Sequence, residues 1–145
     1  MMCVDASVVA KWFLREESTD QARALLRGAL STGETIVAPP LMPYEVTNIF
    51  HQRQRAGGSL SFEEALEFLD DFLRLPIELR NPPGLHRRAL ILADTHGLPA
   101  AYDAHYLALA EQLGCTLWTD DRRLLRILEG RLPFVRPISD YGATD

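Results

Sequence analysis

Short apolar runs that alternate with amphipathic stretches constrain the fold of this chain most strongly. The runs are three or four residues long, which suits buried strands better than helices. They cover residues 2–4, 35–38, 77–79, 115–118 and 132–135. The stretches between them repeat apolar residues every three or four positions, which is typical of helices with one buried face. This alternation predicts an α/β sandwich with a mainly parallel central sheet.

Several of the expected helices carry boundary signals. Ser61 followed by Glu64 predicts a capping box before a helix that covers residues 62–72. Two glycines, Gly57 and Gly58, separate it from a helix that opens at Pro43, so the two form an αα-hairpin whose apolar stripe packs internally or faces a partner. Further helices are expected at residues 8–14, 19–30, 85–95 and 98–114, the last with Pro99 in its first turn.

Length and composition indicate one globular domain that spans residues 1–145. The chain is 47% hydrophobic and 24% charged, which is enough apolar residues for a sizeable core. Its apolar runs are far shorter than the ~20 residues of a membrane span, and the first residues do not resemble a secretory leader, so we expect a cytoplasmic protein. The two cysteines, Cys3 and Cys115, lie in apolar runs and are expected to be buried free thiols.

The net charge limits the classes of partner. A formal charge of −5 argues against a general nucleic-acid coat protein, because non-specific binding to phosphates depends on excess positive charge. It leaves open an enzyme whose basic residues are gathered locally around its site.

An acid on an apolar helix face is the most informative single residue. In the helix expected at residues 98–114, Asp103 shares a face with Tyr106, Leu107 and Ala110. A carboxylate that points inward costs free energy unless the positive helix N-terminus or a bound cation compensates it. The helix alone does not decide between these two explanations.

Other acids follow the ends of predicted strands. Asp5 follows the first strand, Glu45 comes after the second, and Asp120 and Asp121 come after the run at residues 115–118. Any one of them is most simply a helix cap or a first-turn residue. Because the carboxyl ends of parallel strands meet at one edge of a sheet, these acids and Asp103 are expected to converge there.

Converging carboxylates point to metal chemistry. Four of them at short range would repel one another and call for a divalent cation. Ligation by oxygen alone, without histidine or cysteine, favours magnesium or manganese. Such a site suits hydrolysis of phosphodiester bonds, in which metal ions activate water and stabilise the leaving oxygen.

The acidic segments resemble the motifs of a known family. Val4–Ser7, Pro43–Asn48, Ala101–Ala110 and Leu117–Leu124 are similar, in order and spacing, to the motifs of PIN-domain ribonucleases, in particular VapC-type toxins of toxin–antitoxin systems. The resemblance implies a PIN-like three-layer α/β/α sandwich with a protruding helical hairpin. It also implies an Mg²⁺- or Mn²⁺-dependent endoribonuclease that acts as a toxin, is commonly a homodimer, and is inhibited by a VapB-type antitoxin.

The same resemblance assigns roles to individual residues. It implies that four acids hold the metal and carry catalysis, helped by a hydroxyl that orders the metal or water: Asp5, Glu45, Asp103, Asp121 and Thr119. Asp121 is chosen over Asp120 because the family acid stands two residues after the hydroxyl. Supporting roles around the ligands are expected for Ser7, Asn48 and Asp120, and RNA contacts for Arg122, Arg123 and Lys11.

Two other classes remain as alternatives. Receiver domains and haloacid-dehalogenase-type phosphatases also gather acids at this sheet edge. The phosphatases need a second aspartate where this chain has Ser7, and both classes need a lysine late in the sheet, whereas the only lysine is Lys11. A catalytically silent PIN-like interaction protein would keep the fold but would have no use for four intact acids.

Overall fold

The central sheet is parallel throughout. The computed structural model describes residues 1–143; residues 144 and 145, the end of the predicted domain 1–145, lie outside the described residues. The strands are β1 (Met2–Val4), β2 (Ile36–Ala38), β3 (Ile77–Leu79), β4 (Leu117–Thr119) and β5 (Val135–Pro137). Their order in the sheet is β3-β2-β1-β4-β5, and every neighbouring pair is parallel. The predicted α/β class is confirmed.

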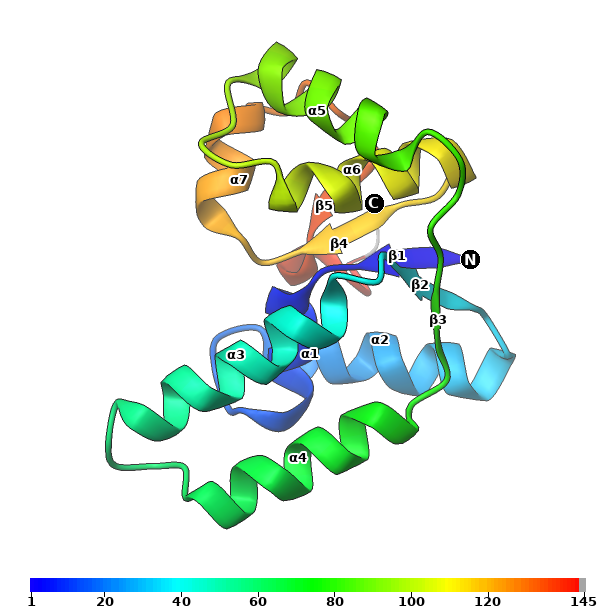
Figure 1. Cartoon of the computed structure of the whole chain (residues 1–145). Coiled ribbons are helices and arrows are strands. Elements are labelled where there is room, and N and C mark those ends of the chain that lie inside the picture. Colours follow the sequence, from blue (N-terminus) through cyan, green and yellow to red (C-terminus); the bar gives the residue numbers. More distant parts are fainter. Residues whose placement is uncertain (144–145) are drawn as a thin grey trace.

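Helices cover both faces of this sheet and make three layers, as predicted. They are α1 (Ala6–Phe13), α2 (Thr19–Thr32), α3 (Met42–Arg55), α4 (Phe62–Arg74), α5 (Leu85–His96), α6 (Tyr102–Leu113) and α7 (Arg122–Leu128), followed by the short 3-10 helix η1 (Ile138–Asp140). Figure 1 shows α5, α6 and α7 on one face, and α1 to α4 on the other. Within residues 1–143, none of these helices has the length and apolarity that crossing a bilayer requires.

Strand order creates a crevice at one edge of the sheet. The chain builds β1, β2 and β3 outward in one direction and then returns to place β4 and β5 on the other side of β1. In such sheets, ligands bind beyond the carboxyl ends of the strands at the point where the order reverses. That point lies here between β1 and β4, whose residues are fully buried.

The helical hairpin protrudes from the domain. Figure 1 shows α3 and α4 running antiparallel and extending beyond the sheet. Its inner side packs on α1 through Phe13, Phe50 and Phe68, with ring centroids 5.6 to 5.9 Å apart. The capping box of Ser61 and Glu64 opens α4 as predicted.

Two sequence predictions differ from the structure. The edge strand predicted at 132–135 starts only at Val135, because the Val135 N–H donates to the Leu132 carbonyl in a turn. Helix α6 begins at Tyr102, so Pro99 lies outside it; the Leu98 N–H instead donates to the Ala93 carbonyl and closes α5.

Both cysteines are free thiols, as expected. Cys3 is buried in β1, and burial raises the pKa of its thiol well above the usual value. Cys115 was predicted to be buried as well, but it is only partly buried, because it lies just before β4.

Candidate functional site

Asp5 occupies the junction between β1 and α1. Its Oδ1 accepts hydrogen bonds from the backbone N–H groups of Ser7 and Val8, which makes it the N-cap of α1. The Ser7 hydroxyl also donates to Oδ1, and the Thr119 hydroxyl donates to Oδ2. Donors from the start of α1 and from the last residue of β4 therefore hold both carboxylate oxygens of Asp5 in place.

Ser7 and Thr119 each join Asp5 to the segment after β4. The Thr119 Oγ1 accepts a hydrogen bond of 2.9 Å from the Asp121 N–H, and the Ser7 Oγ accepts one of 2.8 Å from the Asp120 N–H. The two hydroxyls thus donate to Asp5 and accept from the backbone beyond β4. This arrangement ties the carboxyl ends of β1 and β4 together across more than a hundred residues of sequence.

Asp120 and Asp121 point to different surroundings. Asp121 is the N-cap of α7, where its Oδ1 accepts from the Leu124 N–H at 3.0 Å, and it lines the same pocket as Asp5. Asp120 instead forms an ion pair of 2.8 Å with Lys11, whose side chain is only 4% exposed. Asp121 therefore lines the pocket, whereas Asp120 is paired with Lys11.

Glu45 lies in the first turn of α3 and is held by a tyrosine from α6. The Tyr106 hydroxyl donates a hydrogen bond of 2.6 Å to Glu45 Oε1. Burial raises the pKa of Glu45, the Tyr106 hydrogen bond opposes this rise, and the charges of Asp103 and Asp121 add to it. Tyr106 was not among the expected site residues, although its position three residues after Asp103 on the same helix face was a usable signal.

Asp103 completes the group from the first turn of α6. It does not cap that helix, since the N-cap position is Ala101. Burial raises the pKa of Asp103, and the charge of Asp121 raises it further. Its position therefore combines a partly buried carboxylate with a like charge nearby.

The four predicted acids line one pocket of about 170 Å³: Asp5, Glu45, Asp103 and Asp121, together with Ala6, Ser7, Ile49 and Tyr106. Two of them also cap helices, so the capping and site explanations are not exclusive. Among residues 1–143, none of the four forms an ion pair with a basic side chain. Burial raises the pKa of Asp5 to about 7, against hydrogen bonds from Ser7, Thr119 and Val8 that lower it.

The donor chemistry of this pocket fits a hard divalent cation. All four side chains offer carboxylate oxygens, which Mg²⁺ and Mn²⁺ prefer. Burial raises the pKa of Asp5, Glu45 and Asp103, so ionising these three acids carries a cost that a cation would relieve. Within the described part of the chain, no three His, Cys, Asp or Glu side chains already stand close enough to hold one ion. The four carboxylates therefore line one pocket, but no three of them lie close enough together to coordinate one ion.

Two of the predicted residues, Asn48 and Lys11, do not line the pocket. Asn48 is exposed on α3, and the hydrogen bond to Glu45 comes from Tyr106 instead. The buried ion pair of Lys11 with Asp120, and its hydrogen bond to the Glu17 carbonyl, are inconsistent with the predicted RNA contact, so Lys11 is a structural residue.

Arg122 and Arg123 begin α7, immediately after Asp121, and both are exposed. Arg122 pairs with Glu17 at the surface. The two guanidinium groups are therefore accessible from solvent beside the acidic pocket.

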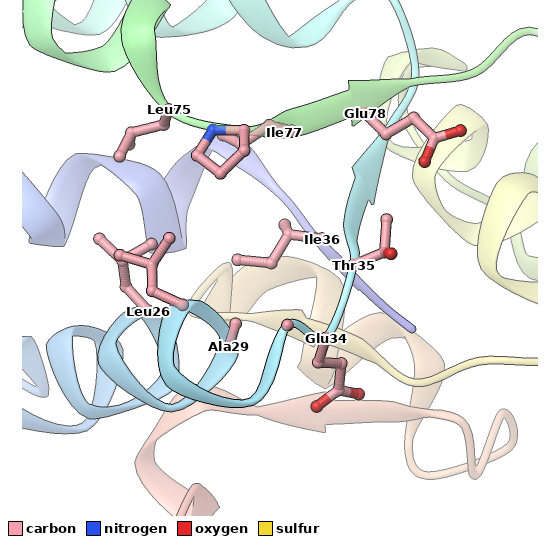
Figure 2. Close-up of a pocket in the computed structure, with 11 residues that line it drawn as sticks. Leu26, Ala29, Glu34, Thr35, Ile36, Leu75, Ile77 and Glu78 are labelled. Atoms are coloured by element: carbon pink, nitrogen blue, oxygen red, sulfur yellow. The ribbon is translucent and has the colours of Figure 1, made fainter.

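A larger cavity lies at the opposite edge of the sheet. It has a volume of about 430 Å³ and lies at the amino ends of β2 and β3, beside α2, as Figure 2 shows. Its two carboxylates are neutralised: Glu34 pairs with the N-terminal ammonium and Glu78 with Arg80. The acids of this cavity are therefore balanced by cations, in contrast to those of the small pocket.

Comparison with known proteins agrees with this geometry. The sequence profile of the PIN domain matches residues 2–129. The chain belongs to the PIN-domain family. The matched region contains every acid of the pocket, and this PIN domain is 33% identical to Ribonuclease VapC3 of Pyrobaculum aerophilum over 125 residues, which is 85% of this chain and 91% of that protein.

A solved structure shares the fold of this PIN domain. The crystal structure of PAE2754 from Pyrobaculum aerophilum superposes with a TM-score of 0.67 at 25% identity, covering 95% of this chain and 90% of that one. Together with the identity to Ribonuclease VapC3, this makes the chain a VapC-type PIN domain.

Proposed function

We propose that this PIN domain is a metal-dependent endoribonuclease and the toxin of a type II toxin–antitoxin pair. The observation that carries the proposal is the single pocket lined by four carboxylates from four separate segments, without a basic partner among residues 1–143. The name of the relative Ribonuclease VapC3 supports RNA as the substrate. An RNA substrate also favours action in the cytoplasm.

In this proposal, Asp5, Glu45, Asp103 and Asp121 hold Mg²⁺ or Mn²⁺. When bound, the cation supplies a Lewis acid that offsets charge on the phosphate and lowers the pKa of water. Hydrolysis would form a bond between the water oxygen and phosphorus and break one phosphodiester P–O bond, and the leaving oxygen would take a proton from solvent.

The chain's own residues position the reacting groups. Ser7 and Thr119 restrain both oxygens of Asp5. Tyr106 restrains Glu45 Oε1, which leaves Oε2 to accept the proton of the attacking water. The raised pKa of Glu45 makes this carboxylate a stronger base than an ordinary glutamate, which suits a group that accepts a proton from water.

Cleavage by purified protein tests the proposal. Wild type should cut structured RNA that contains unpaired loops in manganese buffer and not in EDTA, and Asp103→Asn should lose most of that activity. Glu67→Gln is the matched control, because it removes one exposed acid of α4 that lies outside the pocket. Equal cleavage by Asp103→Asn and wild type would contradict the proposal.

Partners are proposed on the helical hairpin. The hairpin exposes Phe62, Leu66 and Leu73, each more than two-fifths accessible. Exposed apolar side chains of this kind mark interaction surfaces, and the VapC relationship favours a VapB-type antitoxin and a second copy of the chain as occupants.

Co-expression with the product of the neighbouring gene tests the partner assignment. The antitoxin should copurify with wild type and be lost with Phe62→Ser/Leu66→Ser, while Glu67→Gln retains it. A monomer by light scattering without any copurifying partner would contradict both assignments.

A further inference from the structure

A second cavity lies beside the acidic pocket. It has a volume of about 370 Å³, within the range of small-molecule sites, and lies among the amino-terminal ends of α3, α5 and α6. Its walls include Pro40, Tyr44, Asn81, His86, Tyr102 and His105. The proposed hydrolysis does not use any of these side chains.

This cavity shares its helices with the acids. Tyr44 immediately precedes Glu45 on α3, and Tyr102 immediately precedes Asp103 on α6. His105 is close enough to Glu45 for its charge to oppose the rise in pKa that burial causes there. A ligand in the cavity therefore lies next to the acidic pocket.

The lining favours an uncharged aromatic ring. The residues that line the cavity include no Lys, Arg, Asp or Glu, so it offers neither a cation for a phosphate nor an acid for a basic group. Tyr44 and Tyr102 are 76% and 65% exposed, which is unusually high for tyrosines. Exposed aromatic faces stack on unpaired nucleobases.

Polar groups at the rim can contact the edge of a base. The Ala101 carbonyl can only accept, so His105 Nδ1 donates to it at 2.8 Å. His105 Nε2 and His86 Nδ1 lie within hydrogen-bond distance at 2.9 Å, which leaves His86 Nε2 to contact a ligand. The amide of Asn81 supplies both a donor and an acceptor.

We propose that this cavity binds one unpaired nucleobase of the RNA, in a nucleotide next to the phosphate that is cut. The base stacks on Tyr44 or Tyr102, and the adjoining phosphate reaches Glu45 and Asp103. The inference rests on the proposed nuclease function and adds to it that the substrate is single-stranded at the site, because a base within a duplex cannot enter the cavity.

An abasic scan tests this inference. A set of synthetic single-stranded RNAs, each lacking one base at a different position, is titrated against wild type in EDTA by fluorescence anisotropy, and kcat/KM for cleavage of the same RNAs is measured in manganese. One abasic position should weaken binding or kcat/KM about tenfold, the typical size of a stacking contact. The double variant Tyr44→Ala/Tyr102→Ala should weaken binding or lower kcat/KM for the intact RNA by a similar factor. In this variant, loss of the base at that position should have no further effect.

Two controls separate stacking from other causes. Tyr44→Phe/Tyr102→Phe keeps the rings and should retain the abasic response, and Leu90→Ala removes an equally exposed apolar side chain of α5 and should change nothing.

The possible results separate this inference from the nuclease function. Cleavage with an equal response at every abasic position would overturn the base cavity alone, whereas the absence of manganese-dependent cleavage would overturn the nuclease function. If Tyr44→Ala/Tyr102→Ala converts a dimer to a monomer and leaves the abasic response intact, the cavity is a contact between copies and the inference is wrong.

Discussion

Lys11 and Asp120 form an ion pair of 2.8 Å at the start of α7, and this pair directs Asp120 away from the acidic pocket that Asp121 lines. We therefore predict that Asp121→Ala abolishes cleavage, while Asp120→Ala leaves cleavage by the folded protein intact. Asp120→Ala should instead lower the free energy of unfolding by roughly 3 kcal/mol, because it leaves the buried Lys11 ammonium without a counter-ion. Denaturant unfolding and a cleavage assay measure the two effects.

The double variant Lys11→Met/Asp120→Ala is the control for this explanation. Replacing the pair with apolar side chains should recover most of the lost stability. Loss of cleavage in Asp120→Ala, with cleavage retained in Asp121→Ala, would show that the fourth acid is Asp120.

Tyr106→Phe removes the hydrogen bond to Glu45 and keeps the ring. Because that bond holds down a pKa that burial raises, the pKa of Glu45 should rise further in the variant. Glu45 would then ionise only at higher pH, so the acidic limb of the pH–rate profile for cleavage should move upward. A profile that keeps its midpoint while the overall rate falls would indicate a purely structural role for Tyr106.

Asp103→Asn separates a metal site from a structural acid. In EDTA the variant should be as stable as wild type or more stable, because the substitution relieves repulsion from Asp121. In manganese it should lose most of the rise in Tm, because a ligand stabilises a protein only through occupied native sites. Four thermal melts, each protein in each buffer, provide the test; equal destabilisation in both buffers with an intact metal response would make Asp103 structural.

The metal-free protein should lose stability as the pH rises. Asp5 has a pKa of about 7 in the folded chain and 3.8 ordinarily, so between these values the folded state binds more protons than the unfolded state. Linkage then requires the free energy of unfolding to fall through this window, by a few kcal/mol if Asp5 dominates. Denaturant unfolding in EDTA at several pH values should show a shallower fall in Asp5→Asn; identical slopes would contradict the prediction.

Arg123 should contribute to RNA binding more than Arg122 does. Both are exposed beside Asp121, but Arg122 is paired with Glu17, whose charge already offsets its own. Each phosphate contact that is lost reduces the slope of log K against log salt by somewhat less than one. Arg123→Gln should flatten this slope in anisotropy titrations, and Arg122→Gln should flatten it less; an unchanged slope in both would exclude them from the RNA path.

Local pattern was sufficient for the elements and for most of the acids. Apolar runs predicted all five strands, with boundaries within three residues of the observed ones, because a short buried strand consists of consecutive apolar side chains. Parallel strands end at a common edge, so Asp5, Glu45 and Asp121 were expected there from chain order alone. The caps formed by Asp5 and Asp121 depend on neighbouring backbone N–H groups, which are also local.

Partners that lie far apart in the sequence were decided only by packing. Tyr106 contacts Glu45 across 61 residues of sequence, and Lys11 contacts Asp120 across more than a hundred. Both contacts depend on how α6 and α1 are positioned against the rest of the fold. Periodicity assigns a residue to a face but does not identify which side chain meets it there. The amino-acid sequence by itself determined the α/β class and the edge of the sheet where the acids gather. The tertiary structure alone decided which side chains hold each acid and which basic residue is buried, because those contacts depend on how distant helices pack together.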